Sequence, residues 1–294
     1  MSDWTISRKP GNPGEIAPAA PRFDKNIPNE FASWIIDDVL PTIEVTQPFD
    51  IIGALAPVSP GHPAHVLVKT GAGFDNRNVV LHIKPAAASE IWPVLFPLLE
   101  RVYSLGNVAC NPVLFRSGTY GELIDGHAVT ATLHIPGRHG PLSENDPLEV
   151  GRSLSRLHAV ISDADANGDI AERYDALNRT LCTEAEKIRS DNTARSPETW
   201  RESLLEAANS FDQIPNAPSP FNRQQVLHGD LSPGNVLFTD DGAVFLDFED
   251  MTITCAPIAL DVASVVLRFC RFDTRSRYEI DAAATVEAYL GQAD

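Results

Sequence analysis

Short apolar runs separated by turn residues dominate the first half of the chain. An apolar helix is predicted at residues 31–40, where Pro41 ends it. Apolar residues at helical spacing, from Ile91 to Val102, predict a second helix that runs to about residue 105. The strand patterns, bounded by Pro- and Gly-rich turns, fall at residues 46–56, 64–70, 78–84, 112–117 and 127–134.

After Gly137 the pattern becomes mainly helical. Asp146-Pro147 supplies an N-terminal cap and a first-turn proline, and apolar residues from Val150 to Ile161 then follow one face. Further helices are predicted at residues 170–177, 184–190, 198–211, 257–269 and 278–291, and strands at 225–227, 236–239 and 243–248.

This order of elements predicts an α+β fold with two lobes. A small antiparallel sheet with one helix forms the first lobe, and helices with a few short strands form the second. We expect a flexible N-terminal tail at residues 1–27, an N-lobe at 28–137 and a C-lobe at 138–294. No internal repeat is found.

Composition narrows the possible partners. Of the 294 residues, 23 are Lys or Arg and 40 are Asp or Glu, which gives a net charge of −17. This acidity argues against binding to nucleic acid or an anionic membrane and is compatible with a cationic ligand. No apolar run reaches the roughly 20 residues of a membrane span, and the N-terminus carries no secretory pattern. Four widely spaced cysteines are typical of reduced thiols, so we expect a cytoplasmic protein.

One group of polar residues is spaced for phosphoryl transfer. His228, Asp230 and Asn235 form an HxDxxxxN pattern, and Asp247 follows twelve residues later at the end of a predicted strand. In kinases a carboxylate accepts the proton of the attacking hydroxyl, while an amide and a second carboxylate hold metal. Transferring phosphate spreads negative charge over several oxygens, so hard oxygen ligands for Mg²⁺ are needed beside it.

The sequence here resembles the aminoglycoside phosphotransferase and choline kinase-like family, whose fold is protein-kinase-like. HGDLSPGNVLF and VFLDFED carry the resemblance, supported by LHIKP, ATLHIPG and GRSLSRLHAV, and it covers most of residues 45–290. It implies that Asp230 is the catalytic base and that Asn235 and Asp247 bind Mg²⁺. It also implies that His228 supports the loop, and that Asp261 ties the segment after the metal site to it.

The resemblance further implies a nucleotide site. Lys84 is similar to the strand lysine that holds the α- and β-phosphates of ATP, with Glu100 as its expected helix partner and Glu90 as a weaker candidate. The phosphate loop would fall at Ser59 and Gly61, in a segment stiffened by prolines. Adenine would contact backbone at the hinge, residues 134–136, which includes His134 and Ile135.

Several alternatives stay open or are set aside. A metallophosphoesterase needs histidine ligands downstream, and no histidine follows His228. Protein kinase activity is disfavoured because Gly229 replaces an arginine and no Ala-Pro-Glu signature follows. The expected function is phosphorylation of a small-molecule hydroxyl by ATP; a non-catalytic nucleotide-binding pseudokinase is the alternative, suggested by the stiff phosphate loop. The sequence does not identify the acceptor, does not distinguish ATP from GTP as the donor, and does not give the oligomeric state.

Two groups of acidic residues could attract a cationic substrate, although the sequence indicates this less strongly. Asp247 and Glu249 would point to the same side of an extended strand, where Glu249 or Asp250 can face a cationic substrate. Acidic residues across 163–212 are expected to form a solvated face, with attraction of a polyamine-like acceptor such as an aminoglycoside as the functional alternative. His158 is expected to be a packed core histidine.

Overall fold

The structure is a computed structural model, and every structural statement below concerns the residues it describes. These are residues 27–43, 50–55, 64–70, 78–105, 108–139, 143–165, 168–176, 179, 223–270 and 275–291. The expected N-terminal tail lies almost wholly outside them. The predicted helices at 184–190 and 198–211 and the predicted phosphate loop also lie outside the described residues.

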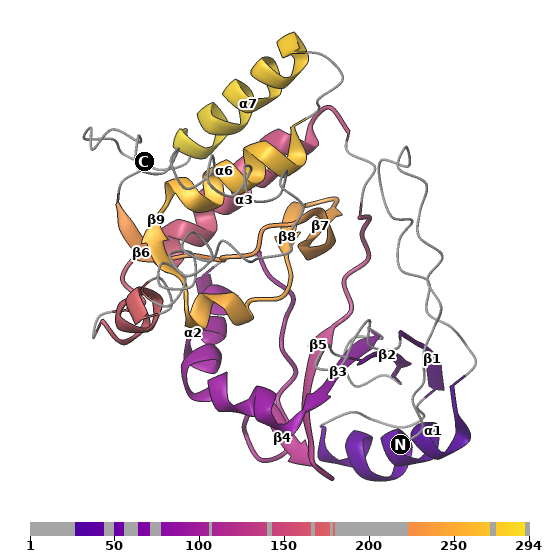
Figure 1. Cartoon of the computed structure of the whole chain (residues 1–294). Helices are drawn as coiled ribbons and strands as arrows, with labels where there is room; N and C mark the ends of the chain where they lie inside the picture. The colour runs from indigo at the N-terminus through magenta and orange to yellow at the C-terminus, as the bar shows by residue number, and fades with distance from the viewer. Residues whose placement is uncertain are drawn as a thin grey trace, which may run out of the picture.

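The N-terminal lobe is built on one antiparallel sheet of five strands in the order β1-β2-β3-β5-β4 (Figure 1). Its strands are β1 (Asp50–Leu55), β2 (Ala64–Lys69), β3 (Val79–Pro85), β4 (Gly121–Ile124) and β5 (His127–Leu133). The strands predicted near β1, β2, β3 and β5 are therefore confirmed.

One predicted strand is wrong and one strand was missed. Residues 112–117 make only isolated bridges, such as that of Pro112 with Thr132, because Pro112 has no N–H to continue a ladder. The fifth strand is instead β4, which pairs with β5 across the two-residue turn Asp125-Gly126. Both turn residues have positive φ, 48° and 77°, as a type I′ hairpin requires.

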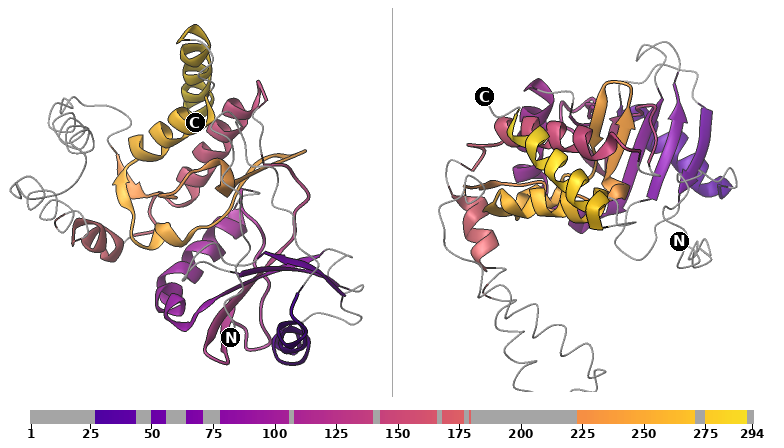
Figure 2. Two further views of the ribbon diagram at one scale, coloured as in Figure 1. Left: turned by 45° about the vertical axis from the view of Figure 1, so that its right-hand side comes forward. Right: turned by 90° about the horizontal axis from the view of Figure 1, so that it is seen from above.

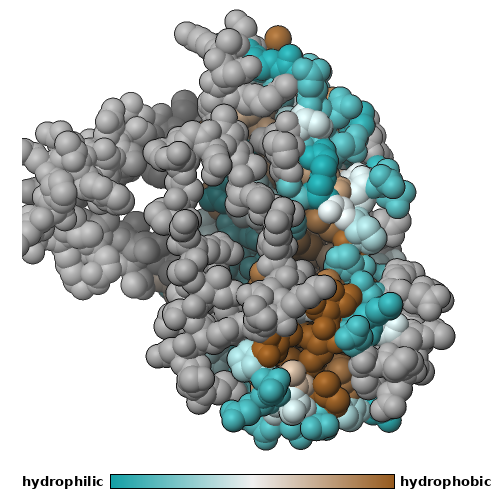
Figure 3. All heavy atoms as spheres, turned by 90° about the vertical axis from the view of Figure 1, so that its right-hand side faces the viewer, coloured by the Kyte–Doolittle hydropathy of each residue, from teal (hydrophilic) through white to brown (hydrophobic). Residues whose placement is uncertain are grey.

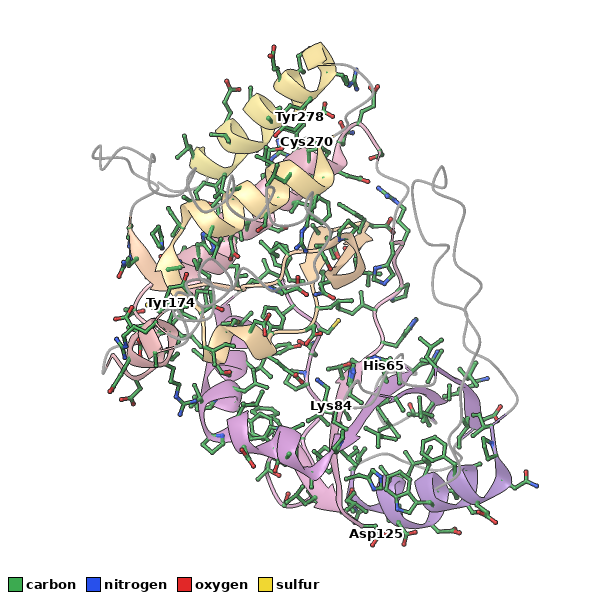
Figure 4. The ribbon with its side chains drawn as sticks, in the orientation of Figure 1. His65, Lys84, Asp125, Tyr174, Cys270 and Tyr278 are labelled. Carbon is green, nitrogen blue, oxygen red and sulfur yellow. The ribbon has the colours of Figure 1, made fainter. Side chains whose placement is uncertain are left out.

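The two faces of the sheet differ. On β3, Val79, Leu81 and Ile83 are buried in the core of the N-terminal lobe, which the residues from Ile35 to Ile43 also join. The alternate residues of β3 point to the other face, because side chains of a strand alternate. Figure 4 shows Lys84 and His65 on this second face, toward the C-terminal lobe.

The segment before the sheet is only partly α-helical. It begins as α1 (Asn29–Trp34), widens into a π-helical turn at Ile35–Val39 and ends as a 3₁₀ turn at Leu40–Thr42. Pro41 lies in the last turn, where it blocks further α-helix as predicted. Its buried residues cover the outer face of the sheet.

The C-terminal lobe gathers three long helices around short strands (Figures 1 and 2). Helix α3 begins at Asp146, with Asn145 in the N-cap position, so the N-cap predicted at Asp146 is wrong by one residue; no side-chain hydrogen bond caps the helix. The elements of this lobe are α3 (Asp146–Val160), β6 (Gln224–Val226), β7 (Val236–Thr239), β8 (Gly242–Phe245), β9 (Cys255–Pro257), α6 (Ala259–Phe269) and α7 (Arg275–Leu290). Strands β7 and β8 form a hairpin, and β6 pairs with β9, a strand that the sequence analysis did not predict.

Helix α2 (Trp92–Leu105) links the two lobes. It follows a 3₁₀ turn at Ala86–Ile91. Pro93 lies in the first turn of α2, and because proline has no N–H it cannot donate the hydrogen bond that would extend the α-helix toward residue 86. Its predicted apolar stripe is buried: Leu95, Leu98 and Val102 belong to the same core cluster as α3 and β8. The helix is therefore packed on the C-terminal lobe while its N-terminus follows β3.

The surface shows no sign of a membrane-spanning element. In the part of the chain that the structure describes, no helix is long and apolar enough to cross a bilayer. On the side of the molecule that carries β1, apolar residues reach the surface of the N-terminal lobe between hydrophilic ones (Figure 3). Strand β1 is the edge of the sheet, and its Ile51, Ile52 and Leu55 are only partly buried.

Candidate active site

The segment after β6 is anchored by a buried histidine. His228 has no exposed surface, and its Nε2 lies 3.0 Å from the carbonyl oxygen of Leu246. The backbone N–H of Asp230 points to its Nδ1 at 3.4 Å. Burial lowers the pKa of His228, against the opposing effect of Asp261, and the neutral ring can donate from Nε2 while accepting at Nδ1. His228 thus connects the loop of Asp230 to the strand end that precedes Asp247.

A buried carboxylate holds the same loop from the other side. Asp261, in the first turn of α6, accepts hydrogen bonds from the backbone N–H of His228 at 2.9 Å and of Gly229 at 3.2 Å. Burial alone would raise its pKa, but hydrogen bonding and charge from His158 and His228 lower it overall. The expectation that Asp261 ties this region together is met by these contacts.

His158 completes this buried network, as a packed core residue. Its Nε2 lies 3.0 Å from Asp261 and its Nδ1 lies 2.8 Å from the hydroxyl of Tyr289 on α7. Burial and the charge of Asp261 raise the pKa of Tyr289 to about 12, so its hydroxyl stays protonated and donates to His158. The loop of Asp230 is therefore braced by α3, α6 and α7.

Gly229 adopts a backbone conformation that other residues rarely enter. Its φ is 86°, and a Cβ at this position would lie 2.7 Å from Oγ1 of Thr254 and 3.0 Å from Cβ of Asp250. The loop therefore needs both the torsional freedom and the small size of glycine. This explains in physical terms why no larger residue stands between His228 and Asp230.

We predict that Gly229→Ala destabilises the protein more than Gly168→Ala does. Gly168 has a similar φ of 78° but no atom within 4 Å of an added Cβ, so it shares the torsional penalty without the clash. Urea denaturation should place the free energy of unfolding of Gly229→Ala about 1–3 kcal/mol below that of the control. Equal destabilisation of the two variants would contradict the close packing described for Gly229.

Asp230 and Asn235 are held together at the end of this loop. The Asn235 side chain donates from Nδ2 to the Asp230 carboxylate at 2.9 Å and to the Asp230 carbonyl at 3.0 Å. Its Oδ1 has no partner in the described chain, and Asp230 is about half exposed. Asp230 can therefore receive a proton from a molecule in solution, and Asn235 offers a free oxygen.

Asp247 lies where the β7–β8 hairpin ends, in a left-handed conformation. Its φ of 59° is uncommon for a residue other than glycine. Strand β8 stops at Phe245, and a 3₁₀ turn follows at Glu249–Thr252. The prediction of an extended strand through 248 is therefore wrong, although Asp247 and Glu249 both line the same cavity.

Lys84 has a different partner from the expected one. Its Nζ forms an ion pair with the carboxylate of Glu249, and Lys84 is mostly buried. Glu100 lies instead on the exposed face of α2, because it is two residues from Leu98 of the buried stripe and so points to the opposite side. Glu90 is also exposed. The expected Lys84–Glu100 pair is thus not formed.

A cavity of about 460 Å³ lies between the lobes, where Lys84 and Glu249 meet. This is within the range of roughly 300–1,000 Å³ typical of small-molecule sites. It brings together five of the residues that sequence analysis selected: Lys84, His134, Ile135, Asn235 and Asp247. Half of the Trp, Tyr and Phe side chains that line it come from α2, namely Trp92, Phe96 and Tyr103.

The hinge forms one wall of this cavity. The N–H of His134 is already bonded to the carbonyl of Asn78, at 2.8 Å, whereas Ile135 makes no backbone hydrogen bond within the described residues. Ile135 thus offers a free donor and acceptor. Gly137 packs so closely on the β7–β8 hairpin that an added Cβ would lie 2.6 Å from Leu237. The hinge is therefore fixed against β7, the strand that pairs with β8 before Asp247.

Two histidines of the cavity form a chain that sequence analysis did not select. His65 on β2 and His82 on β3 are cross-strand neighbours, and their Nδ1 atoms lie 3.0 Å apart. His82 Nε2 lies 2.9 Å from Oγ1 of Thr132. Burial lowers the pKa of His65 and lowers that of His82 well below 6.5, with the neighbouring His65 and Lys84 adding to the effect on His82. The pair is thus neutral near pH 7.

We predict that acidification below about pH 6.5 destabilises the protein through this pair. The unfolded chain takes up a proton on His82 near pH 6.5, whereas the folded chain does so only at lower pH. Stability is therefore complete above pH 6.5 and falls as pH decreases, by up to about 1.4 kcal/mol per pH unit for each histidine. Urea denaturation between pH 7.5 and 5.5 should show a smaller slope in His82→Gln. An unchanged slope would contradict this assignment.

The donor set suits magnesium. Within the described chain, no group of three or more His, Cys, Asp or Glu residues could enclose a metal alone. Mg²⁺ does not need such a cage, since it usually takes one or two protein ligands and completes its shell with water and phosphate. Asn235 and Asp247 provide free oxygens in the same cavity. Burial, followed by repulsion from Asp230 and Asp247, raises the pKa of Asp250, which shows the acidity of this end of the cavity.

The acidic surface predicted at 163–212 is partly described. Asp165 caps the helix at residues 169–176 by accepting hydrogen bonds from the N–H groups of Ile170 and Ala171, at 3.0 and 2.8 Å. Asp163 pairs with Arg101 and is largely exposed. These contacts agree with a solvated, structural face; residues 180–222 lie outside the described chain.

A sequence profile of the phosphotransferase enzyme family matches residues 66–292. The chain belongs to this family. The match includes the cavity residues from β3 and the hinge as well as the segments that carry Asp230, Asn235 and Asp247, and begins one residue after His65, the cavity residue on β2. No curated protein sequence matches the chain significantly.

Solved structures support the kinase-like fold of this phosphotransferase. An amicoumacin kinase, hAmiN, in complex with AMP-PNP, Ca²⁺ and its ligand is 14% identical, with a TM-score of 0.57 over 90% of this chain and 77% of that one. The GDP and kanamycin complex of APH(2″)-IIia is 16% identical, with a TM-score of 0.55 over 90% and 84%. A choline kinase from Cryptosporidium parvum is 14% identical, with a TM-score of 0.51 over 88% and 75%. The predicted α+β, two-lobed kinase-like fold is therefore confirmed.

The site differs from its prediction in identifiable ways. Glu249, rather than Glu100, pairs with Lys84, and its place two residues after Asp247 was the available signal. His65 and His82 gave a weaker signal, as histidines on neighbouring strands. Arg268, described below, is separated by 38 residues from its partner Asp230, and no local pattern connects the two. Ser59 and Gly61 lie outside the described residues.

Proposed function

We propose that this phosphotransferase transfers the γ-phosphate of ATP to a hydroxyl group of a small molecule. The observation that carries the proposal is the shared cavity: it contains Lys84, Asn235 and Asp247, and Asn235 is hydrogen-bonded to Asp230 at its edge. The nucleotides present in the similar structures, AMP-PNP and GDP, support nucleotide use. The proposal takes ATP as the donor, as the resemblance in sequence implies, and leaves GTP as an alternative.

In this proposal each residue has one task. Asp230 accepts the proton of the acceptor hydroxyl as the new bond between its oxygen and the γ-phosphorus forms, while the bond from that phosphorus to the ADP oxygen breaks. Asn235 orients the Asp230 carboxylate through the 2.9 Å hydrogen bond. Lys84 binds phosphate oxygens of the nucleotide, and Ile135 offers its backbone N–H and carbonyl groups to the adenine ring.

Magnesium fits the free oxygens of Asn235 and Asp247, and when bound it neutralises charge that develops on the transferring phosphate. Glu249 holds Lys84 toward this region through their ion pair. His228 and Asp261 act from behind, because their contacts fix the backbone of the loop that carries Asp230.

The proposal is tested by ADP release from ATP in the presence of Mg²⁺ across a panel of aminoglycosides, amino alcohols, sugars and hydroxy acids. Release that depends on an acceptor, and that is lost in Asp247→Asn and on addition of EDTA, is expected. Binding of ATP without any acceptor-dependent release would favour the non-catalytic alternative. Release that persists equally in Asp247→Asn would contradict the assigned metal ligand.

A further inference from the structure

An arginine contacts the carboxylate of the proposed catalytic base. Arg268 lies in the last turn of α6, and its Nη1 donates to Oδ1 of Asp230 at 3.1 Å and to the carbonyl oxygen of Leu231 at 3.3 Å. The side chains of Arg268 and Asp230 are 47% and 45% exposed. A molecule that approaches Asp230 from solution therefore meets this guanidinium group as well.

The guanidinium group has donors to spare. Both of its described contacts use Nη1, so Nη2 and Nε have no partner among the described residues. A guanidinium edge with two free N–H groups matches the two oxygens of a carboxylate or phosphate. The Asp230 carboxylate also keeps acceptor capacity, because Arg268 and Asn235 each contact a different oxygen.

The stretch of sequence that begins at Arg268 is basic, in contrast to the chain as a whole. Residues 268–277 contain four arginines and one aspartate, which gives 4 − 1 = +3, whereas the entire chain has a net charge of −17. An ammonium group brought to Asp230 would lie beside the Arg268 cation and be repelled. The Arg268 cation therefore favours, beside Asp230, the opposite sign from the cationic acceptor that net acidity suggests.

We propose that Arg268 binds an anionic group, a carboxylate or a phosphate, of the molecule whose hydroxyl Asp230 deprotonates. This inference rests on the proposed phosphotransferase function and specifies its acceptor class. The substrate hydroxyl would lie at hydrogen-bond length from Asp230, and the substrate anion at hydrogen-bond length from Arg268. These two groups of the substrate are then roughly 4–7 Å apart. A compact hydroxy acid or a sugar acid or phosphate has this spacing.

The test compares acceptors that share a carbon skeleton and differ in charge. Glucuronate, glucose 6-phosphate, glucose and glucosamine form one set, and glycerate, glycerol and 2-amino-1,3-propanediol form another. Initial rates of ADP release with saturating Mg²⁺ and ATP give KM and kcat for each. The acids or the phosphate are expected to have the lowest KM within their sets, and the two hexose anions distinguish carboxylate from phosphate recognition. A preference for the neutral or amino member would overturn the inference while leaving the kinase function intact.

Variants assign the preference to Arg268. In Arg268→Gln, KM for the preferred anionic acceptor should rise about 10- to 100-fold, while KM for the matched amino compound should stay the same or fall. Arg268→Lys, which keeps the charge, should recover part of the anion preference. A general structural defect would raise KM for all acceptors alike, and that result would overturn the proposal. The matched control is Arg152→Gln on α3, since Arg152 is 45% exposed and also paired, with Glu149 at 2.8 Å.

A binding measurement decides the case in which no acceptor of these sets is phosphorylated. Such silence would count against the proposed function. Calorimetric titration of the protein, loaded with Mg²⁺ and AMP-PNP, with glucuronate and with glucose 6-phosphate then tests Arg268 alone. Binding of either anion that is lost in Arg268→Gln and kept in Arg152→Gln supports the inference. Absence of binding, or equal binding in both variants, overturns it.

Discussion

Replacement of Asp230 by asparagine should lower kcat by a factor of about 10²–10⁴, the usual contribution of a general base. Asparagine keeps the shape and the contacts to Arg268 and Asn235 in part, but it cannot accept the hydroxyl proton. ATP affinity should change little, because Asp230 does not line the cavity that holds Lys84 and Asp247. Steady-state kinetics with the best acceptor, together with calorimetric titration of AMP-PNP, separates the two effects.

Asp241→Asn is the control for this variant. Asp241 is exposed in the turn between β7 and β8, at the far end of the hairpin that leads to Asp247. The same chemical change there should leave kcat within about twofold of the unmodified protein. Retention of full activity in Asp230→Asn would remove Asp230 from the mechanism, whatever the control shows.

Replacement of Asp261 by asparagine should lower the free energy of unfolding by about 3–5 kcal/mol, the usual effect of breaking a buried charged contact. The Asp261 carboxylate is buried and accepts bonds from two backbone N–H groups and from His158. An amide has only one acceptor oxygen, so at least one buried donor loses its partner. Urea denaturation at pH 7.5 measures the loss.

The matched control for Asp261 is Asp163→Asn, because Asp163 pairs with Arg101 but is 74% exposed. Exposed pairs contribute about 0–1 kcal/mol, so this variant should remain close to the unmodified protein. Activity measured at a temperature where Asp261→Asn is still folded should also fall, since the loop of Asp230 is loosened. Similar stability of the two variants would contradict the anchoring role of Asp261.

Much of this architecture follows from local patterns. The apolar spacing of β3, α2 and α3 depends on neighbours a few residues away, and these elements form where periodicity predicts them. Boundaries were less accurate at β8, where the left-handed backbone of Asp247 ends the strand. Hydrophobic periodicity does not report a left-handed backbone conformation. Asp247 adopts it between Leu246, whose carbonyl oxygen contacts His228, and Glu249, which pairs with Lys84.

The candidate site was predictable where spacing along the chain carries the chemistry. His228, Asp230 and Asn235 lie on one loop. In the structure, the Asn235 side chain donates to the Asp230 carboxylate, and the backbone N–H of Asp230 points to the His228 ring. The partner of Lys84 depends on the rotation of α2 and on the turn at Glu249, and the contact of Arg268 with Asp230 depends on how α6 packs. These are properties of tertiary packing, and the residues concerned are far apart in the sequence.

The cavity is proposed to transfer phosphate rather than only to bind a nucleotide. The most direct measurement follows labelled phosphate from ATP, labelled in its γ-phosphate, into the acceptor, with product separated by chromatography and identified by mass spectrometry. We expect label in the acceptor hydroxyl with the unmodified protein and with Asp241→Asn, and none above background with Asp230→Asn. Label found only in inorganic phosphate, or equal labelling of the acceptor with Asp230→Asn, would contradict this proposal.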